Sequence, residues 1–121
     1  MNQDKAQEVS YSLGRMMKKM GELNEQASTT TYNGWANYDT WNVMLWLDND
    51  EELYRDTCRY FEVIRRERKR PTYKGLIAWL SDGNKIVRVT PDDVLWLGDT
   101  LNYTELNRGV VSNFDAWMQY N

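Results

Sequence analysis

Apolar side chains recur at helical spacing through most of the chain, beginning with a stripe near its N-terminus. This stripe comprises Val9, Leu13, Met16, Met20 and Leu23, which are separated by four, three, four and three positions. Such spacing places the side chains on one face and predicts an amphipathic N-terminal helix within residues 1–27. The face is narrow, so the helix either packs on its own domain or pairs with a partner, and a homodimer through this stripe is one of the two expectations.

Residues 28–36 show no such periodicity. They are rich in serine, threonine, asparagine and glycine, which is typical of a loop or linker. The pattern therefore divides the chain into an N-terminal helix over 1–27, a linker over 28–36 and a helical core domain over 37–121.

The core domain opens with a short helix that is apolar on nearly every side. Its apolar residues lie between Asn37 and Asp50, and a helix of this kind belongs in the middle of a core. Asn37 or Asp39 can cap its N-terminus, and Asp50 can cap the helix that follows.

Three further helices are expected in this domain. The first covers about residues 51–69, with one apolar stripe, acidic residues at its start and basic residues at its end, which the helix dipole favours. Pro71 stops it, and a second helix runs over about 72–80. A third, over about 104–118, places its apolar residues on one face.

The segment 85–101 is ambiguous. Residues 85–89 alternate like a short strand, so a small hairpin near 85–90 is one alternative. Thr90 and Pro91 resemble a helix start and predict a single helical turn that carries Val94, Leu95 and Trp96.

The fold class that follows is all-α, a compact bundle of about five helices. The residues expected in its core are Trp41, Leu45, Trp46, Leu53, Phe61, Ile64, Leu76 and Trp79. Trp35 and Trp117 lie near a loop and a chain end, which makes them better candidates for exposed anchors of a partner.

Composition limits the chemistry. The 121 residues include no histidine and one cysteine, Cys58. Histidine-based nucleophile systems and Cys/His zinc sites are therefore excluded, and we expect neither catalysis nor a metal or cofactor site. The longest apolar run is too short to cross a membrane, and we expect a cytoplasmic protein without a membrane partner.

The formal net charge of −3 excludes a broadly basic surface but permits a local one. Basic residues cluster near the end of the predicted helix 51–69, and two more lie on the same helix. They are Arg55, Arg59, Arg65, Arg66, Arg68, Lys69 and Arg70. This group is either a solvated helix end or a macromolecule-binding face, whose partner would be nucleic acid or an acidic protein surface.

A family resemblance rests on two motifs. The run Asn37-Tyr38-Asp39-Thr40-Trp41-Asn42-Val43, followed by Leu45-Trp46-Leu47-Asp48-Asn49-Asp50, resembles a motif of a family of small proteins from bacteria, bacteriophages and mobile elements. The run Leu101–Asn107 is similar to the closing helix of that family.

The resemblance covers residues 34–107 and carries no activity with it. It implies a phage or mobile-element accessory protein in the cytoplasm of a bacterial host. Such a protein would inhibit a host protein, for example an anti-CRISPR or anti-restriction factor acting on a defence nuclease complex. The sequence therefore favours a non-enzymatic binding protein, and the alternative is a nucleic-acid-associated protein that uses the arginine-rich face of helix 51–70.

Overall fold

Four helices form the part of the chain that the computed structural model describes, residues 32–121. They are α2 (Tyr38–Asn49), α3 (Glu51–Arg66), α4 (Tyr73–Asp82) and α5 (Tyr103–Tyr120). No strand occurs within 32–121, so the all-α class is confirmed for this region, while the hairpin near 85–90 is not present. The predicted N-terminal helix and its stripe, with linker residues 28–31, lie outside the described residues.

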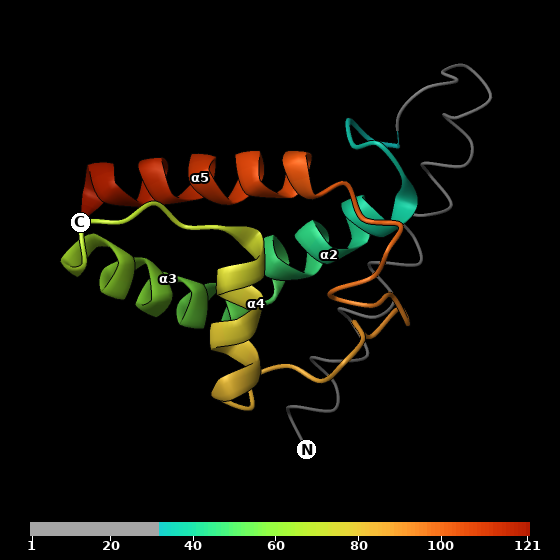
Figure 1. Ribbon diagram of the computed structural model, residues 1–121, viewed down its shortest axis with the longest axis horizontal. Helices are drawn as coiled ribbons and strands as arrows, with labels where there is room; N and C mark the ends of the chain where they lie inside the picture. The colour runs from blue at the N-terminus through green and yellow to red at the C-terminus, as the bar shows by residue number, and fades with distance from the viewer. Residues whose placement is uncertain (1–31) are drawn as a thin grey trace.

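The helices pack as two parallel neighbours with a third crossing them (Figure 1). α3 and α5 run side by side in the same direction, and their C-terminal ends meet at one end of the molecule. α4 crosses this pair, and α2 leads into α3 and contacts α5 as well.

Each of the four helices begins with a side-chain cap. The cap residues are Asn37, Asp50, Thr72 and Asn102. The Asn37 side chain accepts a hydrogen bond from the Thr40 amide at 2.8 Å, so Asn37 and not Asp39 is the cap of α2. Asp50 accepts from the Leu53 amide at 3.0 Å, as the sequence predicted.

The core confirms most of the expected side chains. All residues of α2 from Thr40 to Leu47 are buried, which fits a helix that is apolar on every side. Trp79 differs from the prediction, because it is half-buried against the rim of the main cluster. Trp41 and Leu45 form a separate small cluster with Tyr32.

The end of α3 corrects the expected helix boundary. The helix stops at Arg66, and Arg68 has a left-handed backbone with φ of 58°. The Arg68 amide donates to the Arg65 carbonyl and the Lys69 amide to the Ile64 carbonyl, both at 3.0 Å. This is a Schellman motif in which arginine occupies the position that usually holds glycine. Arg68–Arg70 therefore lie in a loop and do not continue the helix.

The connection from α4 to α5 contains a turn where the sequence predicted a helical turn. Thr90 does act as a cap, because its hydroxyl accepts from the amides of Asp92 and Val94, both at 3.2 Å. Asp93 then adopts a φ of 70°, which no helix tolerates, and Val89 and Leu95 pair as an isolated antiparallel bridge. A capping threonine before proline occurs both at helix starts and in turns of this kind, so the sequence pattern could not distinguish the two.

Residues 32–36 form a tight turn that packs on the core. Asn33 and Gly34 both have positive φ, 50° and 90°, and Tyr32 and Trp35 exchange two backbone hydrogen bonds. This is the geometry of an Asn-Gly type I′ turn. Tyr32 is buried against α2, so these five residues belong to the packed unit.

Gly34→Ala should therefore lower the free energy of unfolding by about 1 kcal/mol, since the left-handed conformation penalises a β-carbon. An added β-carbon would meet no atom within 4 Å, so the cost comes from the backbone alone. Urea unfolding measures it. Gly83→Ala is the matched control, because Gly83 has a φ of −84° and ordinary surrounding contacts, and this variant should lose nothing.

Candidate functional site

The polar residues of the motif at the start of α2 are occupied by contacts with the α4–α5 connection. Asn37 donates to the Thr100 carbonyl at 2.7 Å, and Asp39 accepts a hydrogen bond from the Thr100 hydroxyl. The hydroxyl of Thr40 accepts from the Asn102 amide at 2.9 Å. These side chains therefore fasten the connection to α2.

Asn42 is the centre of a second, buried group of contacts. Its side chain is fully buried, donates to Asp92 Oδ2 at 2.8 Å and accepts from the Thr90 hydroxyl at 2.8 Å. Trp46 Nε1 donates to the same Asp92 oxygen at 2.9 Å. The motif thus specifies a structural latch between α2 and residues 90–102, and leaves few of its polar atoms for substrate or ligand.

Metal binding finds no support in the region described. Within residues 32–121, no three acidic or cysteine side chains gather closely enough to hold an ion. Cys58 is half-buried, and burial raises the pKa of its thiol, which keeps it protonated near neutral pH.

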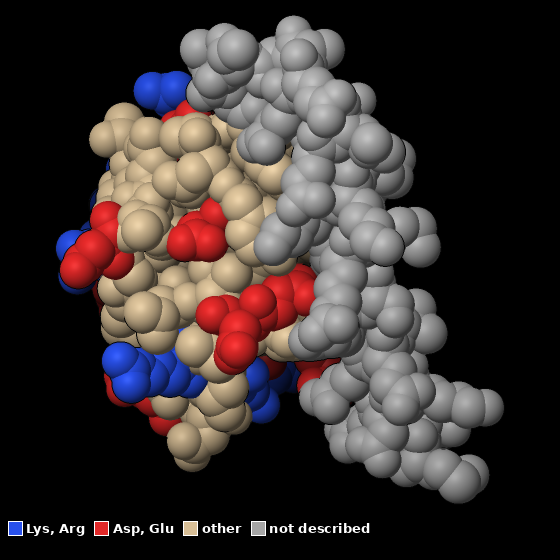
Figure 2. Space-filling view, turned by 90° about the vertical axis from the view of Figure 1, so that its right-hand side faces the viewer, with Lys and Arg blue, Asp and Glu red and all other residues tan. Residues whose placement is uncertain are grey.

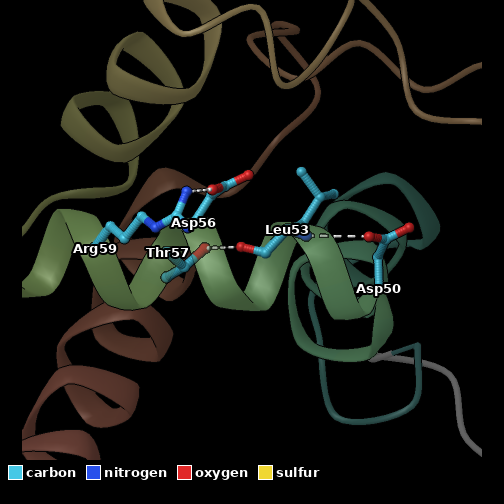
Figure 3. A network of polar contacts seen from close by, with 5 residues as sticks. All are labelled: Asp50, Leu53, Asp56, Thr57 and Arg59. Carbon is cyan, nitrogen blue, oxygen red and sulfur yellow. Dashed lines mark hydrogen bonds and ion pairs between the residues drawn. The ribbon is translucent and has the colours of Figure 1, made fainter.

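The middle of α3 carries basic residues that are already paired. Arg59 Nη1 lies 3.0 Å from Asp56 Oδ1, whose side chain is buried in the helix packing (Figure 3). Arg55 lies 3.3 Å from Glu51, one turn earlier. These arginines form the exposed face that the sequence predicted, but each has a carboxylate beside it.

Two basic residues, Arg65 at the end of α3 and Arg70 in the loop that follows, pack against α5. The guanidinium of Arg65 stacks 4.7 Å from the ring centroid of Trp117 and donates to the Asn121 carbonyl at 2.8 Å. Arg70 donates to Asp115 at 3.2 Å and lies 6.0 Å from the ring centroid of Phe114. Two arginines thus join the C-terminal ends of the two helices.

Arg66 and Arg68 differ from the other basic residues. Both are exposed, and neither forms an ion pair with any residue of the described region. Lys69 sits beside them in the loop and pairs with Glu67 at 3.3 Å.

The last turns of α5, which Arg65 contacts at Trp117 and Asn121, carry exposed and half-exposed apolar side chains. Trp117 is half-buried, and Met118 and Tyr120 are exposed on the last turns of α5. We call the combined surface the arginine corner, which comprises Arg65, Arg66, Arg68, Arg70, Trp117, Met118 and Tyr120. Neither of the two expected tryptophan anchors is fully exposed, because Trp117 is half-buried against Phe61 and Phe114, and Trp35 is half-buried against the core near Gly109.

Sequence reasoning found the basic residues but treated them as one face. Arg55 lies eleven residues before Arg66, which places it about 16 Å away along the helix axis. Trp117 was expected as an anchor, but its position beside Arg65 was not predicted, because α5 and α3 meet only in the folded chain. The face in Figure 2, at the N-terminal end of α2, shows acidic and basic side chains interspersed with uncharged surface.

None of the helices α2–α5 combines the length and the apolar content that a bilayer span requires. No curated protein and no solved structure matches the chain. One family model does match, over residues 28–117, and it describes a family of unknown function. Since the match spans well over half of the sequence, the protein belongs to this family, DUF7249.

Proposed function

We propose that the protein is a non-enzymatic binding protein that contacts a partner protein through the arginine corner. The observation that carries this proposal is the composition of that surface. Arginine, tryptophan, tyrosine and methionine are the residue types enriched in protein interfaces, and here Arg65 is held in place by Trp117. A side chain ordered before binding loses less entropy when the partner arrives.

Charge pairing favours a protein partner over nucleic acid. Five of the seven basic residues lie within 4 Å of a carboxylate, namely Arg55, Arg59, Arg65, Lys69 and Arg70. A phosphate backbone would meet these carboxylates as well as the cations, which weakens the electrostatic attraction on which nucleic-acid binding depends. Arg66 and Arg68 remain to pair with an acidic patch on a protein.

The biological setting rests on the family motif alone. Its resemblance to proteins of phages and mobile elements supports an accessory protein that inhibits a host protein in the bacterial cytoplasm, such as a CRISPR–Cas or restriction nuclease complex. The second candidate, a nucleic-acid-associated protein, is supported by the two unpaired arginines at the same corner.

Capture from host lysate tests the proposal. Tagged protein should retain a host complex, and Arg66→Glu/Arg68→Glu should reduce the recovered amount at least tenfold, which corresponds to about 1.4 kcal/mol. Arg108→Glu is the control, since Arg108 is exposed on α5 without an ion pair in the described region. Calorimetric titration of the purified host complex should rank the affinities in the same way, with the unmodified protein and Arg108→Glu binding more tightly than Arg66→Glu/Arg68→Glu.

Two outcomes would contradict this proposal. In the first, the double variant retains the host complex as well as the unmodified protein does. In the second, the protein binds free oligonucleotides with a steep salt dependence that the double variant abolishes, which would establish the nucleic-acid alternative.

Arg68→Gly should change the stability of the protein and its affinity for the partner in opposite directions. Glycine relieves the left-handed strain at this position, so the free energy of unfolding should rise by about 1 kcal/mol. The same change removes an unpaired cation from the arginine corner, so partner binding should weaken. Urea unfolding and calorimetric titration measure the two effects, and a variant that gains stability with undiminished affinity would remove Arg68 from the proposed surface.

A further inference from the structure

A cavity of about 270 Å³ lies among the helices. Its walls are mostly apolar and come from all four helices. Met44 and Leu47 belong to α2, Phe61 to α3, Leu76 to α4 and Val110 to α5. A cavity of 150 Å³ already holds benzene in a protein core, so this one has room for a substituted ring.

Polar groups line the same cavity beside its apolar walls. Asp48 accepts a hydrogen bond from Asn113 Nδ2 at 2.9 Å, and Tyr54 and Cys58 line the cavity near them. Asp48 and Tyr54 are exposed, which places the cavity mouth at these residues.

Asp48 carries a charge with little compensation. It forms no ion pair with any residue of 32–121, and the Asn113 amide is its one hydrogen-bond partner there. Neighbouring groups displace part of the water around this exposed carboxyl, which raises its pKa above the usual value, while the hydrogen bond from Asn113 lowers it. Both observations describe a carboxylate that a cation would stabilise.

We propose that this cavity binds a small organic amine, whose apolar body lies against Met44, Phe61 and Val110 and whose ammonium group pairs with Asp48. A carboxylate accepts hydrogen bonds and an ammonium group donates them, so the pair is charge-assisted. An anionic ligand would meet Asp48 with like charge. A neutral ligand fills the apolar space but removes water from the carboxylate without replacing its hydrogen bonds.

Benzylamine and benzyl alcohol are the matched probes, since they share the ring and differ in the charged donor. Titrations followed by amide NMR should show benzylamine binding about tenfold more tightly, with shifts at Asn113 and Ala116. Bound benzylamine should also slow the alkylation of Cys58 by iodoacetamide, because the thiol lines the same cavity.

Three variants make the test specific. Asp48→Asn should weaken benzylamine about tenfold and leave benzyl alcohol unchanged. Ala116→Trp should obstruct the cavity from its exposed rim and abolish binding of both probes. Asp82→Asn, an exposed aspartate at the end of α4, should alter neither.

Equal affinity for the two probes would overturn the proposal, as would benzylamine binding that survives both Asp48→Asn and Ala116→Trp. Shifts confined to residues away from the cavity would overturn it too. Each of these results is independent of partner capture, so failure of this inference leaves the proposed function standing, and the reverse also holds.

Discussion

Phe114→Ala is expected to lower the free energy of unfolding by about 4 kcal/mol, the largest effect of any substitution considered. Phe114 is 2% exposed and packs edge-on against Phe61, with 5.4 Å between the ring centroids. It also stacks with Trp117, the ring that supports Arg65. Its removal leaves a cavity where α3 and α5 meet.

Urea unfolding followed by tryptophan fluorescence measures this loss. Met118→Ala is the matched control, because Met118 lies one turn later on α5 and is 40% exposed. It should cost less than about 1 kcal/mol. Comparable losses in the two variants would show that α5 does not dock on α3 through Phe114.

Asn42→Ala should cost about 3 kcal/mol, because it strips partners from buried polar atoms. Thr90 would lose the acceptor of its hydroxyl proton, and Asp92 would lose one of its two side-chain donors. A buried polar group that is left without a partner loses its hydration as well, so it destabilises the fold by more than the net contribution of one hydrogen bond.

Asn113→Ala supplies the comparison in the same urea assay. Asn113 also donates to an aspartate, Asp48, but that contact is exposed, so its removal should cost less than about 1 kcal/mol. If the two asparagine variants unfold at the same urea concentration, the latch between α2 and residues 90–102 contributes no more than a surface contact.

Local features of the fold were predictable from the sequence. Helix periodicity located α2–α5 to within a few residues, and short-range chemistry identified Asp50 as a cap. The end of α3 was misplaced by three residues because its Schellman motif uses Arg68, whereas glycine is the usual marker of such an end.

Contacts between distant residues could not be predicted. The partners of Asn37 and Asn42 lie some fifty to sixty positions further along the chain, and no periodicity connects them. For the same reason the sequence revealed the arginines and named Trp117 as an anchor, but it did not show that Trp117 and Asp115 contact those arginines from α5. The charge of the candidate surface therefore depends on packing that only the folded chain defines.

The latch also bears on how the protein is made. Residues 37–46 are synthesised early, yet the groups that satisfy them, Thr90, Asp92, Thr100 and Asn102, leave the ribosome much later. Until then the polar side chains of the first core helix must remain hydrated. We therefore expect folding of this domain to finish only after residues 90–102 have been synthesised, in one cooperative step that joins segments distant along the chain.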